Sequence, residues 1–406
     1  MTAEGFRDQT AIVGIGYSRS PESPGGFSKN SGESVLTLAV RAAREACADA
    51  GVDPHDVEGA VMYSLNNDSV GPGQLLDVLG STNIKYGVTI TGGGNNPSLI
   101  TTLAGQAVHG GTAKYVLAYR ALNGRSGIRI GQLGGDAARG NLAPGPAQWS
   151  SIYGMAGPPL SFAMAARRYM ELYNVSSEDF GHWAVNGRLN AMKNPRATMR
   201  EAITVEDHQN SRYIVEPYHL LDCCLETDTA VAVLVASTEQ AKSLSKTPVT
   251  ISAGHGGGSP PLDDIVETGF KYTGQQLLDA AGISLSDIDT YHPYENFTDN
   301  PMRQMEDMGW MEHGEASAFA REGRIALDGE IPISTQGGLM NEGYGHGFNN
   351  VLEAVQQLRG QAEDLCPNWA QGEHTYDREI CRQVRDPEVS MHASVSGSGG
   401  LILKKG

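Results

Sequence analysis

One nine-residue pattern occurs once in each half of the chain, and it constrains the fold more than any other feature of the sequence. Ala50 to Glu58 reads AGVDPHDVE, and Ala281 to Asp289 reads AGISLSDID. In both copies an apolar-periodic stretch typical of a helix precedes the pattern, and a strand-like stretch follows it. The glycine suits the position just after a helix, where a left-handed backbone is needed. The repeat therefore predicts two related helix-to-strand units.

Further segments recur in the same order around this pattern. The pairs are Thr10–Tyr17 with Pro248–Ala253, Thr91–Gly111 with Ser334–Gly360, and Lys114–Tyr119 with Val389–Val395. Such alternation of strand and helix signals predicts an α/β fold with two parallel or mixed sheets of βαβ type, related by a pseudo-two-fold axis. We predict an N-terminal half at residues 1–245 and a C-terminal half at residues 246–406.

The first half is longer than the second because it contains extra sequence at about residues 120–213. This insertion opens with a Gly/Ala/Pro-rich stretch at 124–146 and continues with helix candidates at Leu160–Tyr173 and Ser177–Lys193. An irregular segment of this length inside a compact protein favours a binding region over a plain connection. We therefore expect the insertion to form walls of a substrate site.

Composition and charge exclude several classes of partner. With 406 residues, of which 40% are hydrophobic, the chain can form one two-lobed globular body. The formal net charge of −17 opposes phosphate backbones, so we expect no nucleic-acid partner. The sequence shows neither a basic-then-apolar leader nor a run of about twenty apolar residues, so we expect a cytoplasmic protein without a membrane segment.

The cysteines form no recognisable framework. They are five in number, an odd count, at Cys47, Cys223, Cys224, Cys366 and Cys381. Without a Cys-x-x-Cys pair they indicate neither a set of disulfides nor a zinc site, and we expect reduced, mostly buried thiols and no metal.

Several ordered motifs extend over nearly the whole chain. Besides the repeat, they are Ala165–Tyr169 through Asn194–Ala197, Pro217–Val235, and Ser334–Gly347. Together they resemble the thiolase superfamily, most closely its sterol-carrier-protein-X-like or lipid-transfer-protein branch. The resemblance implies a thiolase-like fold, an acyl-CoA substrate with no separate cofactor, and a homodimer through a sheet edge, expected at Lys114–Tyr119. Arg167 and Arg168 are candidates for the coenzyme A phosphates, with a solvated helix face as the alternative.

The resemblance also implies where a thiolase keeps its cysteines, and this chain departs from that pattern. The nucleophile position falls near Gly94, in the segment Thr91–Asn96, which contains no cysteine. The position of the second cysteine falls at Ser394 or Val395. Thiolysis through an acyl-enzyme is therefore not expected.

Two tyrosines occupy the positions at which the resemblance puts acid/base histidines. A phenol with a pKa near ~10 can donate a hydrogen bond to a developing oxyanion while keeping its proton at neutral pH. We predict that Tyr294 and Tyr344 are an essential pair: one takes a β-hydroxyl proton and the other donates to an enolate, in an order that the sequence leaves open. His346 and His292 are candidates to lower a tyrosine pKa or relay the proton, and Glu295 is a secondary candidate base.

The resemblance implies a reaction and a partner. In the resembling branch, aldolases of bacterial steroid side-chain degradation cleave β-hydroxyacyl-CoA in complex with a small OB-fold and zinc-ribbon protein. The leading hypothesis is therefore an aldolase that converts a steroid side-chain CoA thioester to a ketone and a shortened acyl-CoA such as propionyl-CoA, in a heterotetramer with such a partner. Two alternatives stay open: a non-catalytic acyl-CoA or sterol carrier with a degenerate thiolase site, and a subunit that only scaffolds a partner.

Overall fold

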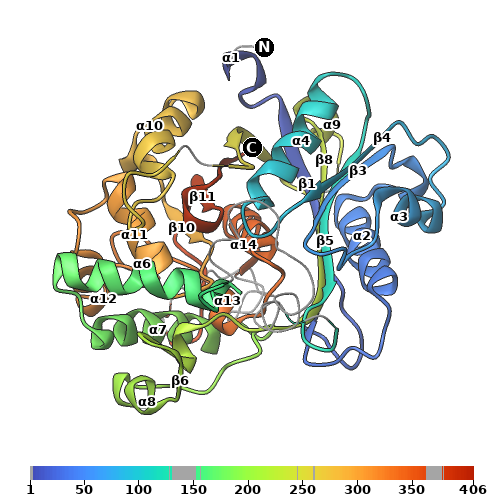
Figure 1. The fold of residues 1–406 in the computed structure, drawn as a ribbon. Coiled ribbons are helices and arrows are strands. Elements are labelled where there is room, and N and C mark those ends of the chain that lie inside the picture. Colours follow the sequence, from blue (N-terminus) through green and yellow to red (C-terminus); the bar gives the residue numbers. More distant parts are fainter. Residues whose placement is uncertain are drawn as a thin grey trace.

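The computed structural model describes residues 3–127, 129, 152–155, 157–244, 246–258, 261–362, 377 and 379–406. These residues fold into two α/β halves that pack side by side, with the N-terminal half in blue and cyan and the C-terminal half in orange and red (Figure 1). None of the described helices is both long and apolar enough to cross a membrane.

Five strands of the first half build one half-sheet. They are β1 (Thr10–Tyr17), β3 (Gly59–Ser64), β4 (Tyr86–Thr91), β5 (Val116–Asn123) and β8 (Asp228–Ser237). Their order in space is β4-β3-β5-β8-β1, and a short strand, β2 (Phe27–Ser28), extends β8. β3 runs parallel to β4 and β5, whereas β8 runs antiparallel to β5 and β1. β1, β3, β5 and β8 are buried almost throughout, as expected for strands covered on both faces.

The second half repeats this arrangement with four strands. Its strands are β9 (Val249–His255), β10 (Thr290–Pro293), β11 (Val389–Ala393) and β12 (Gly400–Lys405). Their order is β10-β11-β12-β9, with β10 parallel to β11, and with β12 antiparallel to β11 and β9. A single parallel bridge between Tyr291 and Ile333 lies where β4 lies in the first half. The predicted pseudo-two-fold relation of the halves is therefore confirmed.

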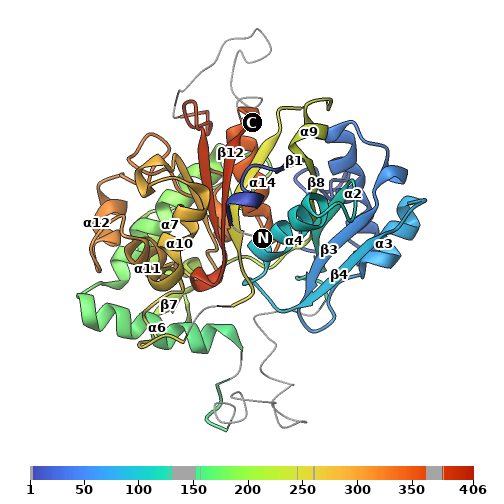
Figure 2. The same cartoon turned by 90° about the horizontal axis from the view of Figure 1, so that it is seen from above.

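The two half-sheets are joined, which differs from the two separate sheets that we predicted. β1 and β9 pair at two positions, Ala11 with Thr250 and Ile12 with Val249, so the two half-sheets form one connected sheet (Figure 2). The boundary between residues 245 and 246 falls in the connection that leads into β9 and stays a prediction.

Both copies of the repeated pattern form a helix, a tight turn and a strand. The elements are α2 (Val35–Ala50) with η1 (Pro54–Asp56), and α10 (Phe270–Ala281) with η5 (Leu285–Asp287). Gly51 and Gly282 end the two helices with φ of 71° and 67°, a left-handed conformation that is strained for residues with a Cβ. The prediction of a helix-ending glycine in each copy is confirmed.

Two helices, one from each half, lie between the half-sheets. α4 (Pro97–His109) and α14 (Phe348–Leu358) share one buried apolar cluster with strands of both halves. The outer face of the first half-sheet is covered by α2 and α3 (Pro72–Leu79), and that of the second by α10 and α11 (Asp299–Met308), as Figure 1 shows. The core is thus layered, with α4 and α14 in the middle layer.

The insertion belongs to the first half in sequence but packs on the second half in space. Its described helices are α6 (Pro158–Tyr173), α7 (Ser177–Met192) and α8 (Val205–Asn210), and the short hairpin β6 (Tyr213–Val215) and β7 (Tyr218–His219) follows at its end. Both predicted helices are confirmed with nearly the predicted bounds, whereas most of the stretch at 124–146 lies outside the described residues. Phe180 and Trp183 of α7 are buried in one cluster with Met302 and Phe319 of the second half. Other short helices among the described residues are α1 (Ala3–Phe6), α9 (Thr238–Ala241), α12 (Ala316–Arg321) and α13 (Gly338–Asn341).

The outermost strand of the first half-sheet is β4, and this corrects our expectation of a sheet edge at Lys114–Tyr119. Most of that segment lies in β5, which pairs with β3 on one side and with β8 on the other. Among the described strands, β4 pairs only with β3, and its residues alternate between half-buried and exposed. An apolar run in a sequence indicates burial but not the order of strands in a sheet, so the pattern could not locate the edge.

Candidate active site

A cavity of about 790 Å³ lies where strands of both halves end. Its wall includes the turn Gly93–Asn95 after β4, Tyr294 after β10, and Val395 after β11. The carboxyl ends of strands are the usual place for ligands in α/β folds. Much of the rest of the wall is apolar, and it includes Phe162 from the insertion and Phe297. The insertion therefore contributes to the cavity wall, as predicted.

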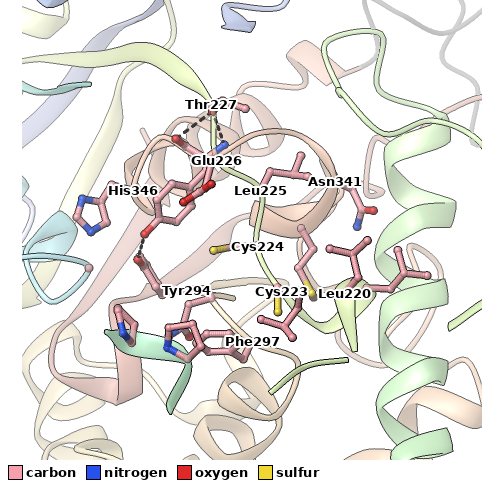
Figure 3. A pocket seen from close by; sticks show the side chains of 18 of the residues that line it. Leu220, Cys223, Cys224, Leu225, Glu226, Thr227, Tyr294, Phe297, Asn341 and His346 are labelled. Carbon is pink, nitrogen blue, oxygen red and sulfur yellow. Dashed lines mark hydrogen bonds between the residues drawn. The ribbon is translucent and has the colours of Figure 1, made fainter. Parts of the chain in front are cut away.

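Tyr294 and Tyr344 face each other in this cavity. Their hydroxyl oxygens are 2.6 Å apart, and their rings meet edge to face with 6.3 Å between centroids. The hydrogen bond at the Tyr294 hydroxyl is drawn in Figure 3. Burial raises the pKa of both phenols well above 10, so both keep their protons at neutral pH. A hydrogen-bonded pair of neutral phenols can accept a proton at one end while it donates one at the other.

The Tyr294 ring is held in a slot between two glycines. A Cβ on Gly94 would lie 2.3 Å from two ring carbons of Tyr294, and a Cβ on Gly347 would lie 2.3 Å from another. The Tyr294 amide donates to the Ala393 carbonyl at 2.8 Å, which fixes the backbone against the end of β11. Residues larger than glycine do not fit at either glycine while the ring keeps this place.

Tyr344 is clamped through its backbone by one threonine. The Tyr344 amide donates to Thr227 Oγ1 at 2.9 Å, and the same hydroxyl donates to the Tyr344 carbonyl at 3.1 Å. Thr227 directly precedes β8 of the first half, whereas Tyr344 lies between α13 and α14 of the second. The two halves therefore fix one tyrosine together.

His346 lines the same cavity as a neutral imidazole. Its Nδ1 accepts hydrogen bonds from Arg120 Nε at 3.2 Å and Nη2 at 3.0 Å, and Arg120 in turn pairs with Asp68. Because a guanidinium only donates, the imidazole proton is left on Nε2, which faces the turn at Gly93. Burial and the Arg120 charge lower the pKa of His346 well below 6.5. This geometry favours a fixed hydrogen-bond donor over a cation that lowers a tyrosine pKa.

Neither His292 nor Glu295 is among the residues that line the cavity. His292 is fully buried near Glu353 and Arg382, and burial lowers its pKa to about 4. The Glu295 carboxylate accepts hydrogen bonds from the Ser334 hydroxyl and, at 3.0 Å, from the Leu339 amide. It fills the turn that leads into α13, so the structure gives it a bracing contact and no approach to the two phenols.

Glu295 is expected to make stability depend on pH near neutrality. Burial raises the pKa of Glu295 from 4.5 to about 7, because the folded protein favours the protonated form. The stability that this preference adds is complete below pH 4.5 and is lost as pH rises through about 7. We expect Glu295→Gln, whose side chain can accept from the Leu339 amide and donate to the Ser334 hydroxyl, to be more stable than wild type at pH 8 by up to ~3 kcal/mol, with the gain shrinking toward pH 5. Urea unfolding at both pH values measures this, and an equal difference at both would contradict it.

Two cysteines line the cavity, which the sequence did not indicate. Cys224 packs against the cluster formed by Tyr294, Tyr344 and Leu339, and Cys223 lies next to it (Figure 3). Burial raises the pKa of Cys223 to about 12 and that of Cys224 well above 9, so both thiols are protonated and poor nucleophiles. Outside the cavity, Cys381 is disulfide-bonded, so the expectation of reduced thiols was wrong for that residue.

We expect Cys224→Ala to keep catalysis. A protonated thiol beside the phenols contributes packing, so kcat should stay within about threefold of wild type. Steady-state kinetics with Cys47→Ala, a free cysteine in a separate core, as the control measures this. Mass spectrometry during turnover should find no acyl group on Cys224, and an acylated peptide would contradict the assignment.

The basic residues at the cavity are not those that the sequence suggested. They are Lys29, Arg125, Arg129, Arg188 and Arg212. Lys29 and Arg212 are exposed and have no acidic partner within 4.0 Å in the described parts of the chain. Arg167 and Arg168 instead pair with surface carboxylates and do not line the cavity. No group of three or more His, Cys, Asp or Glu side chains among the described residues is placed to hold a metal ion.

Comparisons with known proteins agree with this geometry. Residues 261–372 match the family described as thiolase C-terminal domain-like. The chain is 39% identical to the 17-hydroxy-3-oxo-4-pregnene-20-carboxyl-CoA lyase of Mycobacterium tuberculosis, over 87% of this chain and 92% of that protein. It is 40% identical to the steroid side-chain-cleaving aldolase of Thermomonospora curvata, over 86% and 90%. The solved structure of the Ltp2-ChsH2(DUF35) aldolase matches with a TM-score of 0.85 and 35% identity, over 98% of both chains.

More distant relatives define the wider group. The rat sterol carrier protein 2 is 27% identical over 86% of this chain and 66% of that protein. Human mitochondrial 3-ketoacyl-CoA thiolase shares the fold, with a TM-score of 0.66 at 15% identity over 98% of this chain and 99% of that one. The chain therefore belongs to the thiolase superfamily and, within it, to the family of carbon-carbon-cleaving aldolases whose members act on steroid side chains.

Proposed function

We propose that this chain catalyses retro-aldol cleavage of a β-hydroxyacyl-CoA. The observation that carries the proposal is the pair of protonated phenols, 2.6 Å apart, inside a largely apolar cavity. In the reaction the β-hydroxyl loses its proton, the Cα–Cβ bond breaks to leave a ketone, and its electrons pass into the thioester enolate. Protonation of Cα then gives the shortened acyl-CoA. One proton leaves the hydroxyl and one reaches Cα, so no net proton is required.

The tyrosine pair suits this balance because it can pass a proton without becoming charged. One phenol oxygen accepts the hydroxyl proton while its own proton moves to the other phenol, which in turn donates toward the enolate. A single buried phenolate would be costly, since burial raises the pKa of both groups. The short hydrogen bond between Tyr294 and Tyr344 provides the link for this transfer.

His346 supplies a further donor in this proposal. The contact of Nδ1 with Arg120 leaves the proton on Nε2. The His346 ring lies on the cavity wall, and its centroid is 6.4 Å from that of Tyr294 and 5.4 Å from that of Tyr344. A neutral donor that needs no reorganisation stabilises an enolate oxygen in an apolar site. We assign His346 to the thioester oxygen and not to proton removal.

The proposal includes no cysteine nucleophile. The resemblance puts the thiolase nucleophile near Gly94, and the Tyr294 ring fills the space that a side chain at Gly94 would need. The cavity cysteines are protonated. The site is therefore suited to proton transfer without an acyl-enzyme.

We infer that the substrate is a steroid side-chain CoA thioester, with a shortened product such as propionyl-CoA. Both aldolase relatives are named for steroid substrates, and this cavity offers an apolar wall of suitable size. Lys29 and Arg212, exposed at the cavity, provide charges for the coenzyme A phosphates.

We propose two protein partners. The neighbouring aldolase structure contains a DUF35 subunit, which supports a complex with a small OB-fold and zinc-ribbon protein as a heterotetramer.

A second copy of this chain would pair along the outer edge of β4. Thr89, exposed in that strand, would then lie near its copy, so Thr89→Lys should shift a sedimentation profile from dimer toward monomer. An unchanged dimer would contradict this edge.

One assay tests the proposed function. The protein is incubated, with and without a DUF35-class partner, with a tertiary β-hydroxyacyl-CoA, and ketone and shortened acyl-CoA are followed by chromatography. Formation of both products in equal amounts is expected. Binding without turnover under both conditions would favour the acyl or sterol carrier, and absence of binding would favour a scaffold subunit.

A further inference from the structure

A buried arginine lines the cavity without a direct ion pair to a described residue. Arg188, in α7, is 4% exposed, yet no carboxylate lies within 4.0 Å of it in the described parts of the chain. Its Nε donates to Asn341 Oδ1 at 2.6 Å, and its Nη1 donates to the Glu201 carbonyl at 2.7 Å. Both acceptors are neutral, so the only negative charge found to act on Arg188 is that of the Glu201 carboxylate, which makes no direct ion pair with it.

The third nitrogen of this guanidinium is open to the cavity. Arg188 Nη2 has no hydrogen-bond acceptor among the described residues, and it is not fully buried. A guanidinium stays protonated under all ordinary conditions, so Nη2 always presents N–H donors. Such donors in an apolar wall are costly until a ligand supplies an acceptor.

Arg188 and Asn341 lie at the end of the cavity away from the tyrosines. Figure 3 shows Asn341 across the cavity from Tyr294 and His346, beside the α7 helix that carries Arg188. Among the labelled side chains, Cys223, Cys224 and Leu225 lie between these ends. The cavity thus carries the two tyrosines with His346 toward one end and Arg188 with Asn341 toward the other.

We propose that Arg188, held by Asn341, binds a ketone oxygen at the end of the substrate skeleton that is remote from the cleaved bond. This rests on the proposed function, because it assigns the two ends of one ligand to the two ends of the cavity. The Mycobacterium tuberculosis relative is named for a 17-hydroxy-3-oxo compound. Those oxygens stand at opposite ends of a rigid four-ring skeleton, which is the pattern that the cavity presents.

The test compares two tertiary β-hydroxyacyl-CoA substrates that differ only in the remote ketone, the 3-oxo compound and its 3-deoxy analogue. Wild type is expected to prefer the 3-oxo compound by at least about tenfold in kcat/KM, because the analogue leaves Nη2 without an acceptor. Arg188→Met should lose this preference by losing activity on the 3-oxo compound alone. Arg125→Met is the matched control, since Arg125 lines the cavity but pairs with Glu226, and it should keep the preference.

Direct binding separates this proposal from the proposed function. Dissociation constants are measured for the ketone product and its 3-deoxy counterpart with wild type, Arg188→Met and Arg188→Lys. Wild type should bind the ketone product more tightly than its 3-deoxy counterpart. If Arg188→Met loses this preference and Arg188→Lys partly keeps it, the subsite is supported even when no turnover is seen. If Arg188→Met loses affinity equally for both compounds, or keeps the wild-type preference, the proposed subsite is wrong. If the methionine variant does not fold, the same comparison is made with Arg188→Lys.

Discussion

Removing either phenolic hydroxyl is expected to abolish carbon-carbon cleavage. Tyr294→Phe and Tyr344→Phe should each lower kcat by about 10²- to 10⁴-fold, the range for loss of a general acid or base. Because the two hydroxyls form one hydrogen-bonded relay, the double variant should be hardly worse than either single variant. Single-turnover measurements with a tertiary β-hydroxyacyl-CoA would report the chemical step for all three proteins.

Binding and stability controls make this result specific. Tyr119→Phe removes the hydroxyl of another buried tyrosine, which donates to the Val70 carbonyl outside the cavity, and it should leave kcat unchanged. The dissociation constant for the substrate should change little in the Tyr294 and Tyr344 variants, since the apolar wall and the basic residues remain. Turnover within tenfold of wild type in both variants would remove the tyrosines from the mechanism.

The sequence pointed to two side chains that meet in the cavity but not to what holds them. The resemblance aligned Tyr294 and Tyr344 with catalytic positions, and the structure brings them into one cavity. Asp68 and Arg120, which orient His346, were missed because they come from distant parts of the first half and carry no local pattern. Hydrogen bonds between residues far apart in sequence cannot be read from spacing.

Local spacing was misleading near Tyr294. His292 is two residues before Tyr294, and residues two apart in a strand point to the same face. β10 ends at Pro293, however, so that Tyr294 lies beyond the strand and the alternation no longer applies. His292 accordingly stays in the sheet interior while Tyr294 reaches the cavity. The repeat was more informative, because a glycine after each helix depends only on local backbone geometry.

A single methyl group at Gly94 is expected to inactivate the protein. Its Cβ would lie 2.3 Å from two Tyr294 ring carbons, so that the ring would have to leave its slot. Displacing a reacting group by about 1 Å can cost about 10²-fold in rate, and we expect a loss of at least that size in kcat for Gly94→Ala. Gly94 is not among the described glycines with positive φ, so the effect would come from contact with the ring and not from backbone strain.

Gly94→Cys tests the same contact with the Tyr294 ring, because it returns a thiol to the position at which the resemblance places the thiolase nucleophile. Since the Tyr294 ring occupies that space, we expect this variant to lose aldolase activity without gaining thiolysis. Gly73→Ala, whose Cβ would meet nothing within 4 Å, is the control and should leave kcat unchanged. Melting temperatures show whether each variant stays folded.

A folded Gly94→Ala with wild-type kcat would mean that the ring position does not limit the reaction. Thiolysis by Gly94→Cys, with an acyl group on the introduced thiol, would mean that the phenol pair and a nucleophilic sulfur can share one site.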